Sequence, residues 1–269
     1  MFASLSLMWL LLIFVGAAAV VWIAGIWLSD STDVLSSRFG LGQALGGIIL
    51  LAISTNLPEL AITASAALHH DLGVAIGNLL GGIAIQTVVL AVLDFVVEGD
   101  RPLMYRAASL TLVLEAVVVI ATLGIAIMGT QLAPSLIVLR VTPQNFAIAL
   151  TWVAGVYVLQ RTEGHLPWQQ SGKAPGCQSE PAGHSQEQKS KRKGSTGIVV
   201  LQFSVAALAT LAAGVGLELS GDQIARHSGM SGVLFGATVL AASTSIPEIS
   251  TGITSVRMGD YQLAVSDIF

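Results

Sequence analysis

The sequence STNLPE at residues 54–59 recurs in altered form, as STSIPE, at residues 243–248. Aligning Pro58 with Pro247 sets an offset of 189 residues between the two copies. The same offset matches further residues of restricted type: Gly25 with Gly214, Asp33 with Asp222, Gly40 with Gly229, and Asp71 with Asp260. Because these identities fall on glycine, aspartate and proline rather than on common apolar residues, the pattern predicts an internal repeat.

The sequence around both copies is strongly apolar. Of the 269 residues, 54% are hydrophobic and only 10% are charged, whereas about a quarter are charged in a typical soluble domain. Seven runs contain at most one charged residue each: 5–28, 41–68, 72–93, 107–128, 141–160, 197–217 and 228–256. Each is long enough to cross a hydrocarbon core of about 30 Å as a helix. Since backbone groups in lipid must be hydrogen-bonded internally, the sequence predicts an all-α polytopic membrane protein.

Lysine and arginine are distributed unequally between the connections of these runs. If seven helices alternate in direction, ten of the 12 basic residues fall on one side, and only Arg140 and Arg226 fall on the other. Cytoplasmic connections carry the excess of positive charge. We therefore expect an integral protein of the plasma (inner) membrane with its N-terminus outside. The polar segment 161–196, which ends in a basic cluster, is then a cytoplasmic linker with little structure of its own.

The linker divides the chain into two halves. Residues 1–160 contain five expected helices, an odd number, so residues 197–269 enter the membrane from the opposite side. Inverted repeats of this kind place their substrate near the bilayer midplane, between the halves. The second half stops early, so that about seven and a half of ten helices are expected. The simplest interpretation is a chain shortened at its C-terminus, and a genuinely short protein is the alternative.

Glu59 and Glu248 are each the single charged residue of a long apolar run. A carboxylate near the bilayer centre costs about 3 kcal/mol or more unless it is partnered, and such residues mark functional sites. An inverted repeat would bring the two together, where they need a cation, a shared proton or both. A hard divalent cation suits this pair, because Ca²⁺ takes about six to eight oxygen ligands.

Each glutamate is accompanied by further oxygen atoms. The threonine four residues earlier shares a helix face with the carboxylate. The proline before the glutamate lacks the amide hydrogen that would bond the carbonyl group four residues earlier, which frees that carbonyl. The residues concerned are Thr55, Thr244, Ser54 and Ser243. A helix broken in this way is tolerated in a membrane where it lines a cavity or an ion site; the alternative is a simple proline kink beside an internally bonded glutamate.

These motifs resemble those of the calcium:cation antiporters, a family that includes the sodium/calcium exchangers. Both repeats of that family carry a Gly-Thr-Ser-x-Pro-Glu pattern, and the next helix carries Gly-Asn-x-x-Gly-Ser-Asn-x-x-Asn. The second pattern corresponds here to GNLLGGIAIQ at residues 77–86. The resemblance implies an inverted-repeat exchanger bundle of five plus five helices, in which Glu59 and Glu248 bind calcium. It also implies that Thr55, Thr244 and Ser245 help to hold calcium or sodium.

The chain departs from the family patterns at several positions. Ser54 and Ser243 replace glycine, and Asn56 replaces the hydroxyl residue that Ser245 retains. On the next helix Gly82 stands where serine is expected, and Gln86 replaces asparagine but still offers a carbonyl oxygen. The candidate metal-ligating residues are Glu59, Glu248, Thr55, Thr244, Ser245, Ser54, Ser243, Asn56, Gln86 and Asn78. These departures leave both Na⁺ and H⁺ open as the counter-ion.

The expected function is secondary antiport of Ca²⁺ against Na⁺ or H⁺ by alternating access, with no permanently bound cofactor and no nucleic-acid partner. The oligomeric state stays open. The alternative is a cation channel, with the two acids in a selectivity ring, or a non-transporting membrane scaffold or inactive fragment. The string GMSG at residues 229–232 also occurs in rhomboid-type proteases. The five histidines lie in or beside loops, where none can serve as a base within the membrane, so an enzyme is not expected.

Overall fold

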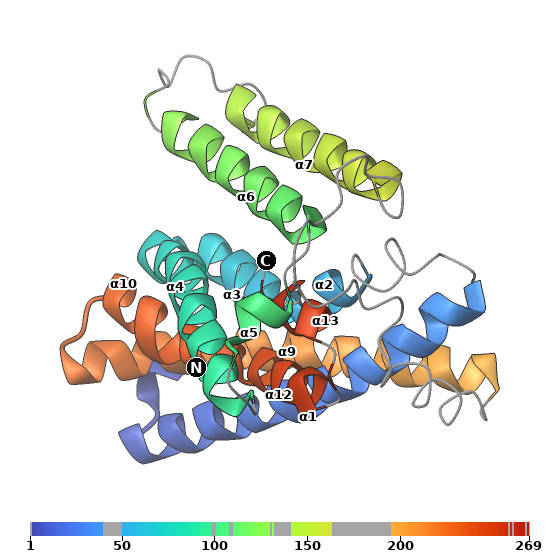
Figure 1. Ribbon diagram of the computed structural model, residues 1–269. Helices are drawn as coiled ribbons and strands as arrows, with labels where there is room; N and C mark the ends of the chain where they lie inside the picture. The colour runs from blue at the N-terminus through green and yellow to red at the C-terminus, as the bar shows by residue number, and fades with distance from the viewer. Residues whose placement is uncertain are drawn as a thin grey trace. The chain divides into compact units, whose positions relative to one another are not determined.

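The computed structural model describes residues 2–39, 50–97, 101–107, 110–129, 131, 141–162, 195–257, 259, 261–266 and 268. Every regular element defined within these residues is a helix (Figure 1). The chain divides into two compact units. One comprises Met1–Asp100 with Glu180–Ile268, and the other comprises Arg101–Ser179 with Phe269.

The larger unit is organised around two helices of 33 residues each, α1 (Leu7–Phe39) and α9 (Thr196–Ser228), which run side by side (Figure 1). The remaining elements are η1 (Phe2–Ser4), α2 (Leu50–Thr55), α3 (Leu57–Leu68), α4 (Leu72–Val96), α10 (Gly232–Phe235), a π-helical turn η4 (Gly236–Leu240), α11 (Ala241–Thr244), α12 (Ile246–Arg257) and α13 (Tyr261–Ser266). Apolar side chains of α1, α3, α4, α9 and α10 form the main core; Phe14, Ile62, Leu217 and Phe235 are among them.

Helices of the two halves begin and end at equivalent residues. Under the offset of 189 residues, both ends of α1 coincide with those of α9, and both ends of α3 coincide with those of α12. The first residue of α4 likewise coincides with the first residue of α13. α9 ends at Ser228 and is followed by Gly229, which adopts a left-handed conformation with φ 72° that glycine accepts most readily. Its repeat partner, Gly40, lies outside the described residues.

α4 packs against α10 and η4 with almost no side chain between the backbones. A Cβ added at Gly77 would meet the carbonyl group of Val233, and one added at Gly81 would meet the backbone of Ala237. From the opposite side, a Cβ added at Gly236 would lie 2.8 Å from the carbonyl oxygen of Val74. Small residues allow helices in membranes to approach this closely. The close contact holds the second half against the helix that carries Asn78.

Adjacent glycines on α4 provide a matched stability test of this packing. Gly81→Ala should lower the melting temperature of the detergent-solubilised protein, because overpacking costs about 1–3 kcal/mol. Gly82→Ala is the control, since a Cβ there meets nothing within 4 Å and alanine favours the helix by about 1 kcal/mol. Tryptophan fluorescence during heating measures both variants. Equal melting temperatures would contradict the close packing of α4 on η4.

The smaller unit contains α5 (Leu103–Arg106), α6 (Leu110–Gly129) and α7 (Pro143–Thr162). α6 and α7 pack along one another, and the absence of a side chain at Gly155 makes room for Val118. At the end of α7 the guanidinium group of Arg161 lies 5.0 Å from the ring centre of Tyr157. Aromatic and basic side chains at helix ends are typical of the membrane interface.

Four helices within the described residues are long and apolar enough to cross a membrane: α1, α4, α6 and α9. The bent pair formed by α10–α11 and α12 gives a fifth candidate. The other two expected runs correspond to shorter apolar helices, α3 and α7; the first part of the run 41–68 lies outside the described residues. Large apolar side chains such as Phe95 and Leu150 are more than two-thirds exposed. Such surfaces suit lipid rather than water, and the chain is an all-α polytopic membrane protein.

Candidate cation site

Both candidate glutamates follow a break between two helices. Asn56 alone separates α2 from α3, with φ −85° and ψ 3°. Ser245 alone separates α11 from α12, with φ −80° and ψ −1°, and the two parts of this second broken helix differ in direction by 43°. Each proline is the second residue of the helix that follows, where its missing amide hydrogen is least harmful. The predicted interruption of both helices is confirmed.

Each of the two prolines packs against a glycine from the other half. A Cβ added at Gly25 of α1 would lie 2.8 Å from Cβ of Pro247. A Cβ added at Gly214 of α9 would lie 3.0 Å from the carbonyl oxygen of Pro58. The two glycines are equivalent under the repeat offset, and so are the two prolines. The two halves therefore make equivalent contacts with one another: α9 packs against the start of α3, and α1 packs against the start of α12.

The carboxyl group of Glu59 reaches the other half directly. The Thr244 hydroxyl interacts with this carboxyl group, and it donates a hydrogen bond to the carbonyl oxygen of Ala241 at 3.1 Å. The second carboxylate oxygen, Oε2 of Glu59, is fully buried and accepts no hydrogen bond in the part of the chain that the structure describes. A buried polar atom of this kind is costly unless water, a proton or a cation satisfies it.

Glu248 is more deeply buried than Glu59 and is 3% exposed. It lies in the first turn of α12. The same helix packs against α4 one turn later, where a Cβ added at Gly252 would lie 2.8 Å from Leu93. The Ser54 hydroxyl lies 3.2 Å from the hydroxyl of Thr32 on α1.

The other candidate ligands differ in burial. Six candidates are buried: Ser54, Thr55, Asn78, Thr244, Ser245 and Glu248. Glu59, Ser243 and Gln86 are partly exposed, and Asn56 is exposed. The Ser243 hydroxyl donates to the carbonyl oxygen of Val239 at 2.7 Å. Gln86 follows Asn78 by about two turns of α4.

Asn78 combines complete burial with an unsatisfied side chain. It is 0% exposed, and neither its amide oxygen nor its amide nitrogen has a hydrogen-bond partner among the described residues. Its backbone lies at the close contact of α4 with η4, 2.9 Å from a Cβ added at Gly236. An amide oxygen is a ligand that Ca²⁺ accepts. Thr210 on α9, which sequence reasoning missed, is likewise fully buried with an unsatisfied hydroxyl.

The available donor set is poor in negative charge. Across the described ranges, no group of three or more histidine, cysteine, aspartate or glutamate side chains could hold a metal ion. The candidate site therefore offers two carboxylates from equivalent positions, and its other candidate ligands are neutral oxygen atoms. Calcium affinity rises with the number of charged ligands.

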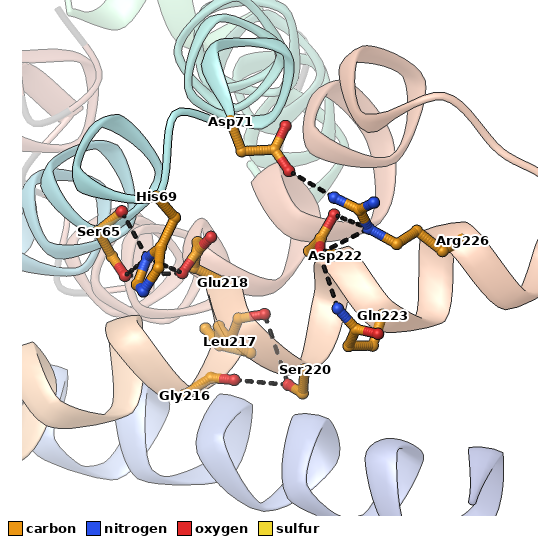
Figure 2. Close-up of polar contacts among 10 residues, drawn as sticks. All are labelled: Ser65, His69, Asp71, Gly216, Leu217, Glu218, Ser220, Asp222, Gln223 and Arg226. Atoms are coloured by element: carbon orange, nitrogen blue, oxygen red, sulfur yellow. Dashed lines mark hydrogen bonds and ion pairs between the residues drawn. The ribbon is translucent and has the colours of Figure 1, made fainter. Parts of the chain in front are cut away.

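Sequence reasoning also missed a third buried acid, Glu218 of α9. Its side chain is 2% exposed and accepts a hydrogen bond from the Ser65 hydroxyl at 2.6 Å (Figure 2). The uncharged run was expected to end at Leu217, but α9 continues through Ser228. The available signal was the four-residue spacing of Ser65, in the last turn of α3, and His69, the residue that follows the helix.

Comparison with known proteins assigns the chain to a family. The model of the sodium/calcium exchanger protein family matches residues 9–161 and 196–269, and the chain belongs to this family. It is therefore a membrane transporter of the cation-antiporter class and not an enzyme. The match leaves out residues 162–195, which correspond closely to the expected polar linker.

Two curated proteins are similar to the chain over most of its length. Inner membrane protein YrbG of Escherichia coli (strain K12) is 24% identical over 262 residues, which cover 96% of this chain and 73% of YrbG. The protein named "Putative antiporter CaxA" from Alkalimonas amylolytica is 24% identical over 262 residues, covering 95% of this chain and 74% of CaxA. No solved structure gives a significant match.

Proposed function

We propose that the chain exchanges Ca²⁺ for Na⁺ or H⁺ across the inner membrane by alternating access at a site built from Glu59 and Glu248. One observation carries the proposal. The carboxyl group of Glu59, beside the first helix break, interacts with the Thr244 hydroxyl beside the equivalent break of the other half. One buried oxygen of Glu59 has no hydrogen-bond partner among the described residues. A cation from solution would satisfy that oxygen. The name of YrbG, an inner membrane protein, supports the proposed location. The name of CaxA, a putative antiporter, supports the proposed activity.

The proposed mechanism is competition for one set of oxygen atoms. Ca²⁺ binds between the two carboxylates, and neutral oxygens complete its coordination: Thr55, Thr244, Ser245, Ser54, Ser243, Asn56, Asn78 and Gln86 supply candidates. When Ca²⁺ leaves, Na⁺ or protons neutralise the same carboxylates. Coupling requires that each occupied form favours the inward-facing and outward-facing states differently.

The proposed topology is an inverted pair, with residues 1–160 and 197–269 as the halves and residues 161–196 as a cytoplasmic linker. The shared helix bounds of α1 with α9 and of α3 with α12 support this division. The exchanged contacts of Gly25 and Gly214 support a two-fold relation between the halves. The excess of basic residues in connections of one side supports an N-terminus outside the cell.

Calcium uptake into everted membrane vesicles that contain the chain tests the proposal. We expect uptake of radioactive calcium when a sodium or a proton gradient is imposed, and no uptake after an ionophore dissipates that gradient. The gradient that drives uptake identifies the counter-ion. Uptake that ignores both gradients and follows only the calcium gradient would instead indicate a channel. The absence of both uptake and calcium binding would indicate a scaffold.

A further inference from the structure

A second group of polar side chains lies where α3 ends, α4 begins and α9 finishes (Figure 2). Glu218 of α9 accepts the hydrogen bond from the Ser65 hydroxyl at 2.6 Å, and Nδ1 of His69 lies 3.8 Å from the same carboxylate oxygen. The carboxyl group is 2% exposed, but the His69 ring is 55% exposed. The partly exposed His69 therefore lies between the buried carboxyl group of Glu218 and the solvent.

The hydrogen bonds of His69 fix which ring nitrogen carries a hydrogen in the neutral form. Nδ1 is 2.9 Å from the carbonyl oxygen of Ser65. A carbonyl oxygen can only accept, so Nδ1 is the donor and Nε2 is the nitrogen that takes up a proton. Protonation then places a positive charge next to Glu218 without moving the ring.

The other charges around Glu218 are largely paired with one another. Arg226 donates to both carboxylate oxygens of Asp222 at 2.9 Å and lies 3.4 Å from Asp71. Burial and the neighbouring Asp222 raise the pKa of Asp71, although Arg226 opposes this shift. α1 packs against this part of α9 and has no charged residue between Leu7 and Ser29, and α10 and η4 have none. Among the described residues around it, His69 is the basic side chain that lies next to the Glu218 carboxyl group.

The group has no counterpart at the equivalent positions of the other half. The repeat offset matches Ser65, His69 and Glu218 with Thr254, Met258 and Ser29, so the equivalent positions of the other half carry neither the acid nor the histidine. Asp71 and Asp222 differ in this respect, because the repeat offset matches them with two further aspartates, Asp260 and Asp33. The histidine–glutamate contact is therefore an addition to the repeated framework, at the face that the proposed orientation places outside.

We propose that His69, Ser65 and Glu218 form a proton-binding site that ties α3 to α9 when His69 is protonated, so that acid on this face slows ion exchange. α3 carries Glu59 at its start, and Gly214 of α9 already contacts Pro58 there. A second attachment at the other end of α3 fixes the helix at both ends. Alternating access requires parts of the bundle to move past one another. The effect on exchange rests on the proposed transport function, whereas the proton-binding contact does not.

A double-mutant cycle in the detergent-solubilised protein tests the contact without measuring transport. The variants are His69→Gln, Glu218→Gln and both together, and the readout is the melting temperature at pH 8 and at pH 5.5. We expect an interaction worth about 2–4 °C at pH 5.5, as for about 1 kcal/mol in a chain of this size, and almost none at pH 8. His70→Asn replaces His69→Gln in the control cycle, because asparagine tolerates the positive φ of 61° at that exposed position. The control should show no interaction at either pH.

Calcium uptake with the pH changed on one side of the vesicle at a time tests the effect on exchange. Acid on the face that holds His69 should slow uptake by the unmodified chain several-fold, and the slowing should disappear in His69→Gln. Acid on the other face should affect both proteins equally. An interaction that is the same at pH 8 and at pH 5.5, or a slowing that persists in His69→Gln, would overturn the proposal. If uptake is absent altogether, the melting cycle still decides whether the proton-binding contact exists.

Discussion

Glu248→Gln is expected to reduce gradient-driven calcium uptake by about 100-fold or more while the protein still folds. The amide has nearly the same volume as the carboxylate, so the packing of α12 persists. It removes one of the two negative charges of the proposed site, and the loss of a charged partner in a buried site costs about 3 kcal/mol, or about two orders of magnitude in affinity. Glu59→Gln should behave in the same way, because the two residues occupy equivalent positions. Uptake in everted vesicles, normalised to the amount of protein, measures the effect.

Glu115→Gln provides the control for both variants. Glu115 is also the single acid of an apolar helix, but it lies on α6 in the other compact unit. Most of the uptake should survive this substitution. If either Glu59→Gln or Glu248→Gln retains full uptake while Glu115→Gln loses it, the proposed site is wrong and α6 carries the ion-binding acid.

Gly25→Val is expected to have the largest effect on stability. A Cβ alone would lie 2.8 Å from Cβ of Pro247, and valine adds two methyl groups to that contact. Overpacking costs about 1–3 kcal/mol, and sometimes more. Either the melting temperature falls by several degrees or α12 moves away from α1, and in both cases calcium uptake is lost. Gly214→Val should cause a similar loss, because Gly214 makes the equivalent contact with Pro58.

Gly16→Val is the matched control on the same helix. A Cβ at Gly16 meets nothing within 4 Å, so valine should be tolerated and uptake should persist. Tryptophan fluorescence during heating and vesicle uptake, measured on the same preparations, compare the three variants. A stable and active Gly25→Val protein would show that α1 and α12 do not approach as closely as described.

The helix breaks were predictable because their cause is local. Pro58 and Pro247 interrupt the hydrogen-bond pattern within a few residues of themselves, and the breaks fall at Asn56 and Ser245. The partners of the prolines were not predictable in the same way. The repeat offset matches Gly25 with Gly214, but it does not say that each glycine meets the proline of the opposite half.

The end of α9 and the role of Glu218 depend on distant residues. A charge after Leu217 ends an apolar run in the sequence, so the span was expected to stop there. The charge is nevertheless buried, because Ser65, which is 153 positions away in the chain, donates a hydrogen bond to it. The π-helical turn η4 was also not expected from sequence. It lies where the backbone at Gly236 meets α4, a contact that only the folded arrangement reveals.

The two glycine–proline contacts also form at different times during synthesis of the chain. α12 emerges from the ribosome long after α1, so its break finds Gly25 already in the membrane. α3 emerges before α9 exists, and its break at Asn56 has no covering helix until Gly214 has been translated and inserted. Glu59, at the start of α3, therefore lacks its neighbouring helix α9 during this part of synthesis. Nascent chains stopped before residue 214 should leave α3 more accessible to proteases or cysteine reagents than chains stopped after α9.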